Sequence, residues 1–310
     1  MIDAVVTWVN GADPQHQNKR AKYLDQTVSP SSYEPTRFDS LGEIRFAVLS
    51  LLQFCPFLRN IHIVTDAQHP VILDPILAAY SNVKVVDHVD IFGEHADLLP
   101  VFSSRSIETM IHRIPGLAEQ FLYLNDDIFV GRPMTPQDYF YDGTPIIRGS
   151  FRSFPNPALQ WLKSKVRKDR PGYNAAQRDA ARLAGLKDKY LISEHQPHPM
   201  RRSTLQTHYK DKVLELREQI SYRFRSSRQV SPIGLSNHLE MARGARVEGP
   251  FDVGYIRPGR PTGTELQNVL SHLNENHFAS FCVQSLDQMP AKDAEAIINA
   301  LNRRYYIRDA

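Results

Sequence analysis

The sequence predicts an α/β protein in which a mostly parallel sheet is covered by helices on both faces. Short apolar runs suited to buried strands occur at residues 2–9, 61–64, 83–86 and 121–124. Segments of helical periodicity lie between them. Polar residues follow each run, which is typical of the ligand-binding carboxyl edge of such a sheet. The chain has 310 residues and 42% hydrophobic content, enough for the core of one sizeable domain or two small ones.

The first predicted strand, residues 2–9, leads into a polar loop that begins with Asn10 and Gly11. That dipeptide is also typical of a hairpin turn. No second strand pattern follows, because residues 15–26 are polar and helix-like, so the sequence favours a βα junction.

Two further helices have start signals in the sequence. Ser40 and Glu43 have the spacing of a capping box, which predicts a helix from Ser40 that ends at Pro56. Ser104 or Ser106 is expected to cap a helix through Ile114.

Arg105 then lies near the positive end of that second helix, where it can contact a phosphate together with free backbone N–H groups. The alternative, that Arg105 pairs with a surface acid, is equally compatible with the spacing.

The last strand of the first half, residues 121–124, ends in Asn125, Asp126 and Asp127. Two adjacent carboxylates at the end of a buried strand repel each other and are costly to desolvate. A hard divalent cation, Mg²⁺ or Mn²⁺, is the simplest compensator, so we expect Asp126 and Asp127 to be metal ligands. Asn and Asp are also common in tight turns, so a turn without a metal is the alternative interpretation of these three residues.

The second half of the chain has a different composition, which divides the sequence at residues 1–150, 151–190 and 191–310. The middle part is rich in Lys, Arg and Ala and is interpreted as a helical insertion or lid, with a basic run at residues 163–170. The third part is expected to complete the core and the site, with a helix at residues 209–218, a strand-like piece at 276–282 and a terminal helix at 293–303.

His195 and His198 alternate with prolines, which excludes a regular helix and fixes where the imidazoles point. A zinc pair is one interpretation, but no Cys or His follows at ligand spacing. A general base or a phosphate-contacting histidine fits better, with a purely structural role as the remaining alternative.

Composition limits the partners. Lys and Arg number 37 against 34 Asp and Glu, which favours no nucleic-acid partner but allows a mild attraction to anionic substrates or membrane surfaces. Cys55 and Cys282 are expected to be reduced core residues. With no signal-peptide pattern and no apolar run of membrane-spanning length, the expected location is cytoplasmic, at most peripheral to the inner face of the cell membrane.

The motifs together resemble the Stealth family of hexose-1-phosphoryl transferases, which includes microbial capsule polymerases and the animal GlcNAc-1-phosphotransferase. The likeness excludes only residues 151–190. It is carried by the run from Ile2 to Asp13, the motifs spread over residues 42–127, His195-Gln196-Pro197-His198, Phe224-Arg225-Ser226 and Phe281-Cys282.

The resemblance implies a GT-A-like sheet and transfer of a hexose-1-phosphate, such as GlcNAc-1-phosphate, from a UDP-sugar to a hydroxyl of an acceptor glycan, with release of UMP. Such a transfer needs a group that accepts the hydroxyl proton, for which His195 is the first choice and Asp127 or His198 the next. A divalent cation on Asp126 and Asp127, together with Arg225 and Arg105, can neutralise the charge of the diphosphate. The implied substrate-binding residues are Trp8, Asn10, Gly11, Asp13, Arg45, Asp66, Arg105 and His198.

Two alternatives stay open. A metal-dependent glycosyltransferase would use the same donor but break the sugar–oxygen bond. A catalytically impaired glycan-binding homologue is the other, because Gln229 and Gln284-Ser285 stand where the family usually carries acids or Asn-Asp.

Overall fold

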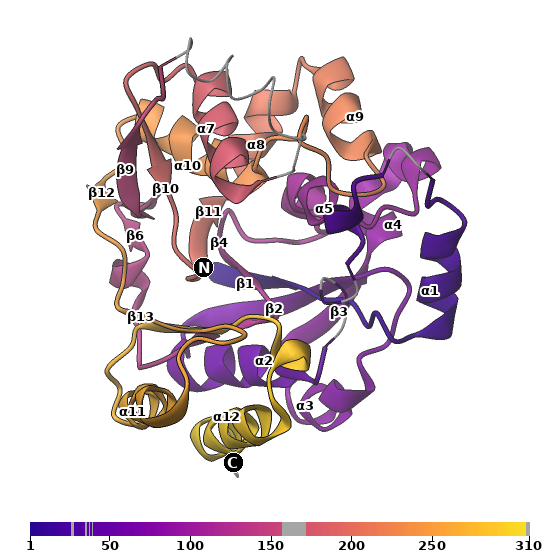
Figure 1. Ribbon diagram of the computed structural model, residues 1–310. Helices are drawn as coiled ribbons and strands as arrows, with labels where there is room; N and C mark the ends of the chain where they lie inside the picture. The colour runs from indigo at the N-terminus through magenta and orange to yellow at the C-terminus, as the bar shows by residue number, and fades with distance from the viewer. Residues whose placement is uncertain (26–27, 35, 37, 39, 157–171, 308–310) are drawn as a thin grey trace.

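A five-stranded sheet with the strand order β11-β4-β1-β2-β3 runs through the middle of the molecule (Figure 1). The structure is a computed structural model that describes residues 1–25, 28–34, 36, 38, 40–156 and 172–307. Strands β1, β2, β3 and β4 are mutually parallel, and only the edge strand β11 is antiparallel. The expected α/β class with a mostly parallel sheet is therefore confirmed. The strands are β1 (Ile2–Thr7), β2 (Leu58–Thr65), β3 (Val83–Asp87), β4 (Gln120–Asn125) and β11 (His198–Arg201).

Helices cover both faces of this sheet (Figure 1). Because successive side chains of a strand point to opposite faces, Ala4 and Val6 of β1 pack on one side and Val5 on the other. The first side is covered by α2 and the C-terminal helices, and the second by α4, α5, α8, α9 and α10. The helices are α1 (Pro14–Ala21), α2 (Glu43–Phe54), α3 (Asp74–Ala79), α4 (His88–Phe92), α5 (Ser104–Met110), α7 (Tyr173–Leu183), α8 (Arg202–Tyr209), α9 (Val213–Ser221), α10 (Pro232–Ala242), α11 (Gly263–Asn274) and α12 (Ala291–Arg304).

One charged residue lies inside the sheet. Asp3 of β1 has an exposed fraction of 0%, and its carboxylate accepts two hydrogen bonds from the Arg59 guanidinium, at 2.9 and 2.6 Å. It also accepts one from the backbone N–H of Ala118 at 2.7 Å. Three chain segments are thereby tied to one buried carboxylate. These hydrogen bonds hold the pKa of Asp3 well below its usual range, against the opposing effect of burial.

The start of α2 differs from the prediction. Its N-cap is Gly42, whose φ of 96° is left-handed, so the expected cap at Ser40 was wrong. Ser40 instead donates its hydroxyl to the Glu43 carboxylate at 2.8 Å. Helix α2 does end at Phe54, before Pro56, as expected.

Two other helix boundaries were also wrong. Helix α5 begins at Ser104 with Ser103 in the N-cap position, and not at a cap on Ser104 or Ser106. The single helix expected at residues 209–218 is two helices, because α8 ends at Tyr209 and α9 begins only at Val213. The expected strands and the terminal helix are all present, as β1 to β4, β14 and α12.

Smaller sheets join the rest of the chain. An antiparallel ribbon of β9 and β10 frames the segment expected to be a helical insertion, and neither strand was expected there. Helix α7 belongs to this segment, whereas the basic run at residues 163–170 lies outside the described residues. The three-part division of the chain stays a prediction. These strands are β5 (Ile128–Val130), β6 (Phe140–Tyr141), β7 (Thr144–Pro145), β8 (Ile147–Arg148), β9 (Ser150–Ser153), β10 (Lys189–Ile192), β12 (Val247–Glu248), β13 (Val253–Ile256) and β14 (Ser280–Val283).

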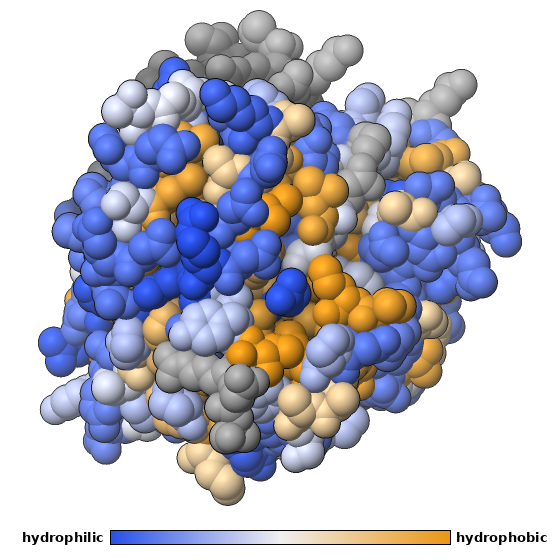
Figure 2. Space-filling model, turned by 90° about the horizontal axis from the view of Figure 1, so that it is seen from below, coloured by the Kyte–Doolittle hydropathy of each residue, from blue (hydrophilic) through white to orange (hydrophobic). Residues whose placement is uncertain are grey.

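The surface on the side of α11 and α12 is mostly hydrophilic, with hydrophobic side chains gathered near its centre (Figure 2). In the part of the chain that the structure describes, no helix has both the length and the apolarity needed to cross a bilayer.

Candidate active site

A cavity of about 820 Å³ lies at the carboxyl edge of the central sheet. The strand order places its lining residues in a row, from His198 of β11 through Asp126 after β4 and Trp8 after β1 to Asp66 after β2 and His88 after β3. Because β11 is antiparallel, its first residue, His198, reaches the edge where the other strands end. A cavity at this edge is the usual ligand site of a parallel α/β sheet.

Asp126 and Asp127 form the turn between β4 and β5 and line the cavity. The tight-turn interpretation is thus correct for the backbone. Burial, the Asp127 charge and the Glu43 charge together raise the pKa of Asp126 well above its usual range. Burial and the Glu43 charge raise the pKa of Asp127 to about 6. Asp127 Oδ1 is buried without a hydrogen-bond partner among the described residues, while Oδ2 accepts the Cys282 thiol at 3.8 Å.

This pair fits a divalent cation in its chemistry. Adjacent half-buried carboxylates with an unpartnered oxygen gain most from a nearby positive charge. No group of three or more His, Cys, Asp or Glu with metal-site geometry occurs among the described residues. Metal binding by Asp126 and Asp127 therefore stays a prediction.

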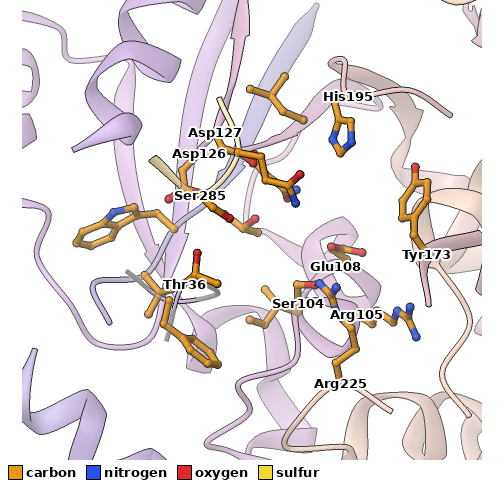
Figure 3. A pocket seen from close by; sticks show the side chains of 18 of the residues that line it. Thr36, Ser104, Arg105, Glu108, Asp126, Asp127, Tyr173, His195, Arg225 and Ser285 are labelled. Carbon is orange, nitrogen blue, oxygen red and sulfur yellow. The ribbon is translucent and has the colours of Figure 1, made fainter. Parts of the chain in front are cut away.

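His195 precedes β11 and lines the cavity on the same side as Tyr173 (Figure 3). Its ring stacks on Tyr255 at 4.8 Å between centroids with an interplanar angle of 6°, and lies 6.5 Å from the Tyr173 ring. Burial lowers the pKa of His195, which keeps the imidazole neutral near pH 7. Burial and, to a smaller extent, the neighbouring His195 lower the pKa of His198 to about 4.

Arg225 is anchored at two points. Its side chain donates to Ser104 Oγ at 2.6 Å, and its backbone carbonyl accepts the Ser32 hydroxyl at 2.7 Å. Figure 3 shows the guanidinium beside Glu108, one turn after Ser104 on α5. Burial raises the pKa of Glu108, and the positive charge of Arg225 opposes that shift. The guanidinium is therefore held in place facing the cavity.

Several lining residues were not predicted. The Tyr123 hydroxyl oxygen lies 2.8 Å from Asn125 Oδ1 and 3.3 Å from Glu108 Oε1, which links α5 to the acidic turn. The spacing of Ser104 and Glu108 could have indicated Glu108 as a site residue, since residues four apart share a helix face. Glu43 and Tyr173 also line the cavity, and no local sequence pattern indicated either of them as a site residue.

Arg105 lines the cavity, and its guanidinium donates hydrogen bonds to backbone carbonyls. Its guanidinium donates to Ser226 at 2.9 Å, Gln229 at 3.1 Å and Gly172 at 3.2 Å. The alternative of a surface ion pair was wrong, because Arg105 is buried. Its contact with a phosphate stays a prediction.

The residues predicted around the first loop divide into two groups. Trp8 and Asp66 line the cavity. Asp13 does not, because it caps α1 by accepting from Gln15 N at 2.8 Å. Asn10 is likewise absent from the lining and hydrogen-bonds Gln68 through its backbone.

Gly11 and Arg45 also lie off the cavity. A Cβ on Gly11 would stand 2.5 Å from the backbone of Phe38, which explains the glycine by close packing. Arg45 lies on α2 with its guanidinium 5.9 Å from the Phe46 ring. The structure does not bring these two residues together with the acidic turn.

The two departures from the expected family pattern have structural roles here. Gln229 is buried and fully paired, accepting from Ser103 Oγ and donating to Ser106 Oγ and the Gln219 carbonyl. It supports the loop that carries Arg225 and does not line the cavity. Ser285 does line it, with a left-handed φ of 54°.

The fold and the cavity define an α/β protein that binds its ligand at the carboxyl edge of a mostly parallel sheet, between an acidic turn and a basic loop. The chain belongs to the Stealth protein family: residues 2–28 match Stealth conserved region 1, and residues 37–146 match Stealth conserved region 2.

Curated relatives carry phosphotransferase names. Two exopolysaccharide phosphotransferases of Streptomyces coelicolor are each 33% identical, over 98% and 91% of this chain. The chain spans only 32% and 47% of their lengths. A capsular polysaccharide phosphotransferase of Aeromonas hydrophila, LcbA, is 28% identical over 98% of this chain and 84% of its own.

Similar solved structures include the galactosyltransferase LgtC in complex with donor and acceptor sugar analogues. It covers 99% of this chain and 98% of its own, with a TM-score of 0.46 and 8% identity. Mouse xyloside xylosyltransferase 1 covers 94% of this chain and all of its own, with a TM-score of 0.43 and 12% identity.

Proposed function

We propose that this chain transfers a hexose-1-phosphate from a UDP-sugar to a hydroxyl of an acceptor glycan. One observation carries the proposal: one cavity is lined by an acidic turn, by a histidine whose pKa is lowered, and by an arginine that a hydrogen bond anchors. The phosphotransferase names of the relatives support the same reaction.

The reaction exchanges one bond at phosphorus for another. The acceptor hydroxyl oxygen attacks the phosphorus that carries the sugar, and the bond from that phosphorus to the bridging oxygen of the diphosphate breaks. The products are a sugar–phosphate–glycan diester and UMP, and the hydroxyl proton must pass to a base. Such a transfer depends mainly on positioning and on stabilising the charge of the phosphoryl group.

His195 is the base in this proposal. Stacking on Tyr255 fixes the ring plane, and the lowered pKa leaves a ring nitrogen free to accept a proton near pH 7. Its position at the β11 end of the cavity assigns the acceptor to that end.

Arg225 stabilises the phosphoryl oxygens. The hydrogen bond to Ser104 and the anchored backbone hold its guanidinium before substrate arrives, so little reorganisation is needed during the reaction. Glu108 keeps the guanidinium oriented through its opposite charge.

Asp126 and Asp127 would hold the divalent cation. Such an ion, when bound, supplies positive charge to the diphosphate oxygens and favours the departure of UMP. The proposal puts the diphosphate beside this acidic turn and the nucleotide toward β1–β3.

The test is an assay with UDP-GlcNAc, Mg²⁺ and a panel of glycan acceptors, with the released nucleotide identified by chromatography and the product by phosphorus NMR. The proposal expects UMP and a phosphodiester signal. Release of UDP would instead establish the glycosyltransferase alternative. Donor binding without turnover on any acceptor would favour the glycan-binding homologue.

A further inference from the structure

The end of the cavity at the carboxyl ends of β2 and β3 contains two buried histidines that the proposed mechanism does not use. His16 on α1 and His88 at the start of α4 line the cavity with exposed fractions of only 3% and 4%. Neither imidazole ring has a hydrogen-bond partner among the described residues, and Nδ1 of each is fully buried. A buried polar ring without a partner is costly, so both rings indicate a ligand that would pair with them.

Asp66 lies between the elements that carry these histidines. On one side, Lys19 of α1 contacts its Oδ2 at 3.2 Å. On the other, the next residue, Ala67, donates its N–H to Asp87 at 2.6 Å, at the end of β3 just before His88. Asp66 Oδ1 accepts no hydrogen bond from the described residues, and Asp66 lines the same cavity.

We propose that His16, Asp66 and His88 read the base of the donor nucleotide and select uracil. The proposal rests on the proposed use of a nucleoside-diphosphate sugar. Two neutral imidazoles each offer one N–H donor, and a carboxylate between them is an acceptor only. Uracil presents the complementary edge, with the acceptors O2 and O4 on either side of the N3–H donor. Cytosine replaces N3–H by an acceptor and O4 by an amino group, which would oppose Asp66 and one histidine.

The surroundings of the two rings support this role. His16 packs against Phe38 and Phe102, with ring centroids 6.0 and 5.4 Å apart, so its orientation is fixed without hydrogen bonds. Burial lowers the pKa of both His16 and His88 to about 4, and each ring therefore keeps one N–H donor and one acceptor at neutral pH.

The experiment measures binding of UDP and CDP to the protein by calorimetry, without acceptor or turnover. The parent is expected to prefer UDP by at least about tenfold, the worth of one good hydrogen bond in a buried site. His16→Phe and His88→Phe keep the ring packing and lose the donor, so each should weaken UDP binding about tenfold and leave CDP binding unchanged within about twofold.

His95→Phe is the matched control. His95 is also buried and its Nδ1 is also unpartnered, but it lies outside this cavity, so the variant should bind UDP like the parent. If a phenylalanine variant melts early, His88→Gln retains an N–H donor and should keep the preference for UDP.

Equal binding of UDP and CDP by the parent would overturn the proposal, as would parallel loss of both nucleotides in well-folded variants, or no UDP binding at millimolar concentration. Failure of this base assignment can be distinguished from failure of the proposed function. Selective UDP binding without UMP release would leave the base assignment intact, whereas UMP release with equal use of CDP-sugars would contradict the base assignment alone.

Discussion

Replacing Arg225 by lysine keeps the positive charge in the cavity and removes the planar fork of the guanidinium. In the structure that fork is held by Ser104 at 2.6 Å and faces the space between the acidic turn and His195. Lysine carries a point charge on a flexible stem and cannot donate two parallel hydrogen bonds to phosphoryl oxygens. Arg225→Lys therefore tests whether geometry or charge matters at this position.

The expected loss in kcat is about 10²–10³-fold, the usual cost of removing one preorganised donor to a transition-state oxyanion. Binding of UDP should change little, because the proposed contact strengthens only as charge develops on the transferred phosphoryl group. The melting temperature should also stay near that of the parent, since among the described residues the Arg225 side chain makes one hydrogen bond, to the partly buried Ser104.

Arg223→Lys is the matched control, two residues earlier in the same loop. Its guanidinium donates to the carbonyls of Leu98 and Pro100, at 3.3 and 2.6 Å, and lies 4.1 Å from the Tyr23 ring centroid. It does not line the cavity. The control should lower the melting temperature and keep the parent's kcat. If Arg225→Lys turns over like the parent, or if both variants lose activity only in proportion to unfolding, Arg225 has no special role in transfer.

Three further predictions concern the base, the acidic turn and the sheet. His195→Ala should lower kcat by about 10²–10⁴-fold in single-turnover assays while UDP still binds, and a well-folded variant at parental rate would remove His195 from the mechanism. Asp127→Asn should abolish the rise in melting temperature that Mg²⁺ or Mn²⁺ gives the parent, and an unchanged rise would exclude Asp127 as a ligand. Asp3→Asn should cost about 3–5 kcal/mol in urea unfolding at pH 7, because it leaves Arg59 without its buried partner. The pKa of Asp3 is lowered in the folded state, so its stabilisation is complete above about pH 4 and is lost below it; a gap between parent and variant that does not narrow in acid would refute this.

The sheet was predictable from sequence because its strands have short apolar runs with polar ends. The run at residues 121–124 predicted β4, and the acidic residues after it do line the cavity. Helix starts were less predictable. The Ser40 and Glu43 pair occurs in the structure, but Gly42 takes the cap because its left-handed φ turns the chain just before α2.

The site was predictable only in part, for a related reason. His195 and Arg225 belong to local motifs that have a recognisable pattern. Glu108 was indicated only by its four-residue spacing from Ser104, and Tyr123 by no pattern, because their roles come from a contact between α5 and β4. The reverse holds for Asp13 and Gly11, where a conspicuous loop motif serves a helix cap and a close packing contact.

The two ends of the cavity are lined by residues from different parts of the sequence. The lining residues of the proposed nucleotide end, Trp8, His16, Asp66 and His88, all precede position 90, whereas the lining residues Tyr173, His195 and His198 come from residues 172–198. Under the proposed function, donor choice and acceptor choice are therefore encoded in separate stretches of the gene. A chimaera that joins the first 150 residues of this chain to the remainder of a relative should inherit the nucleotide preference of the first parent and the glycan preference of the second.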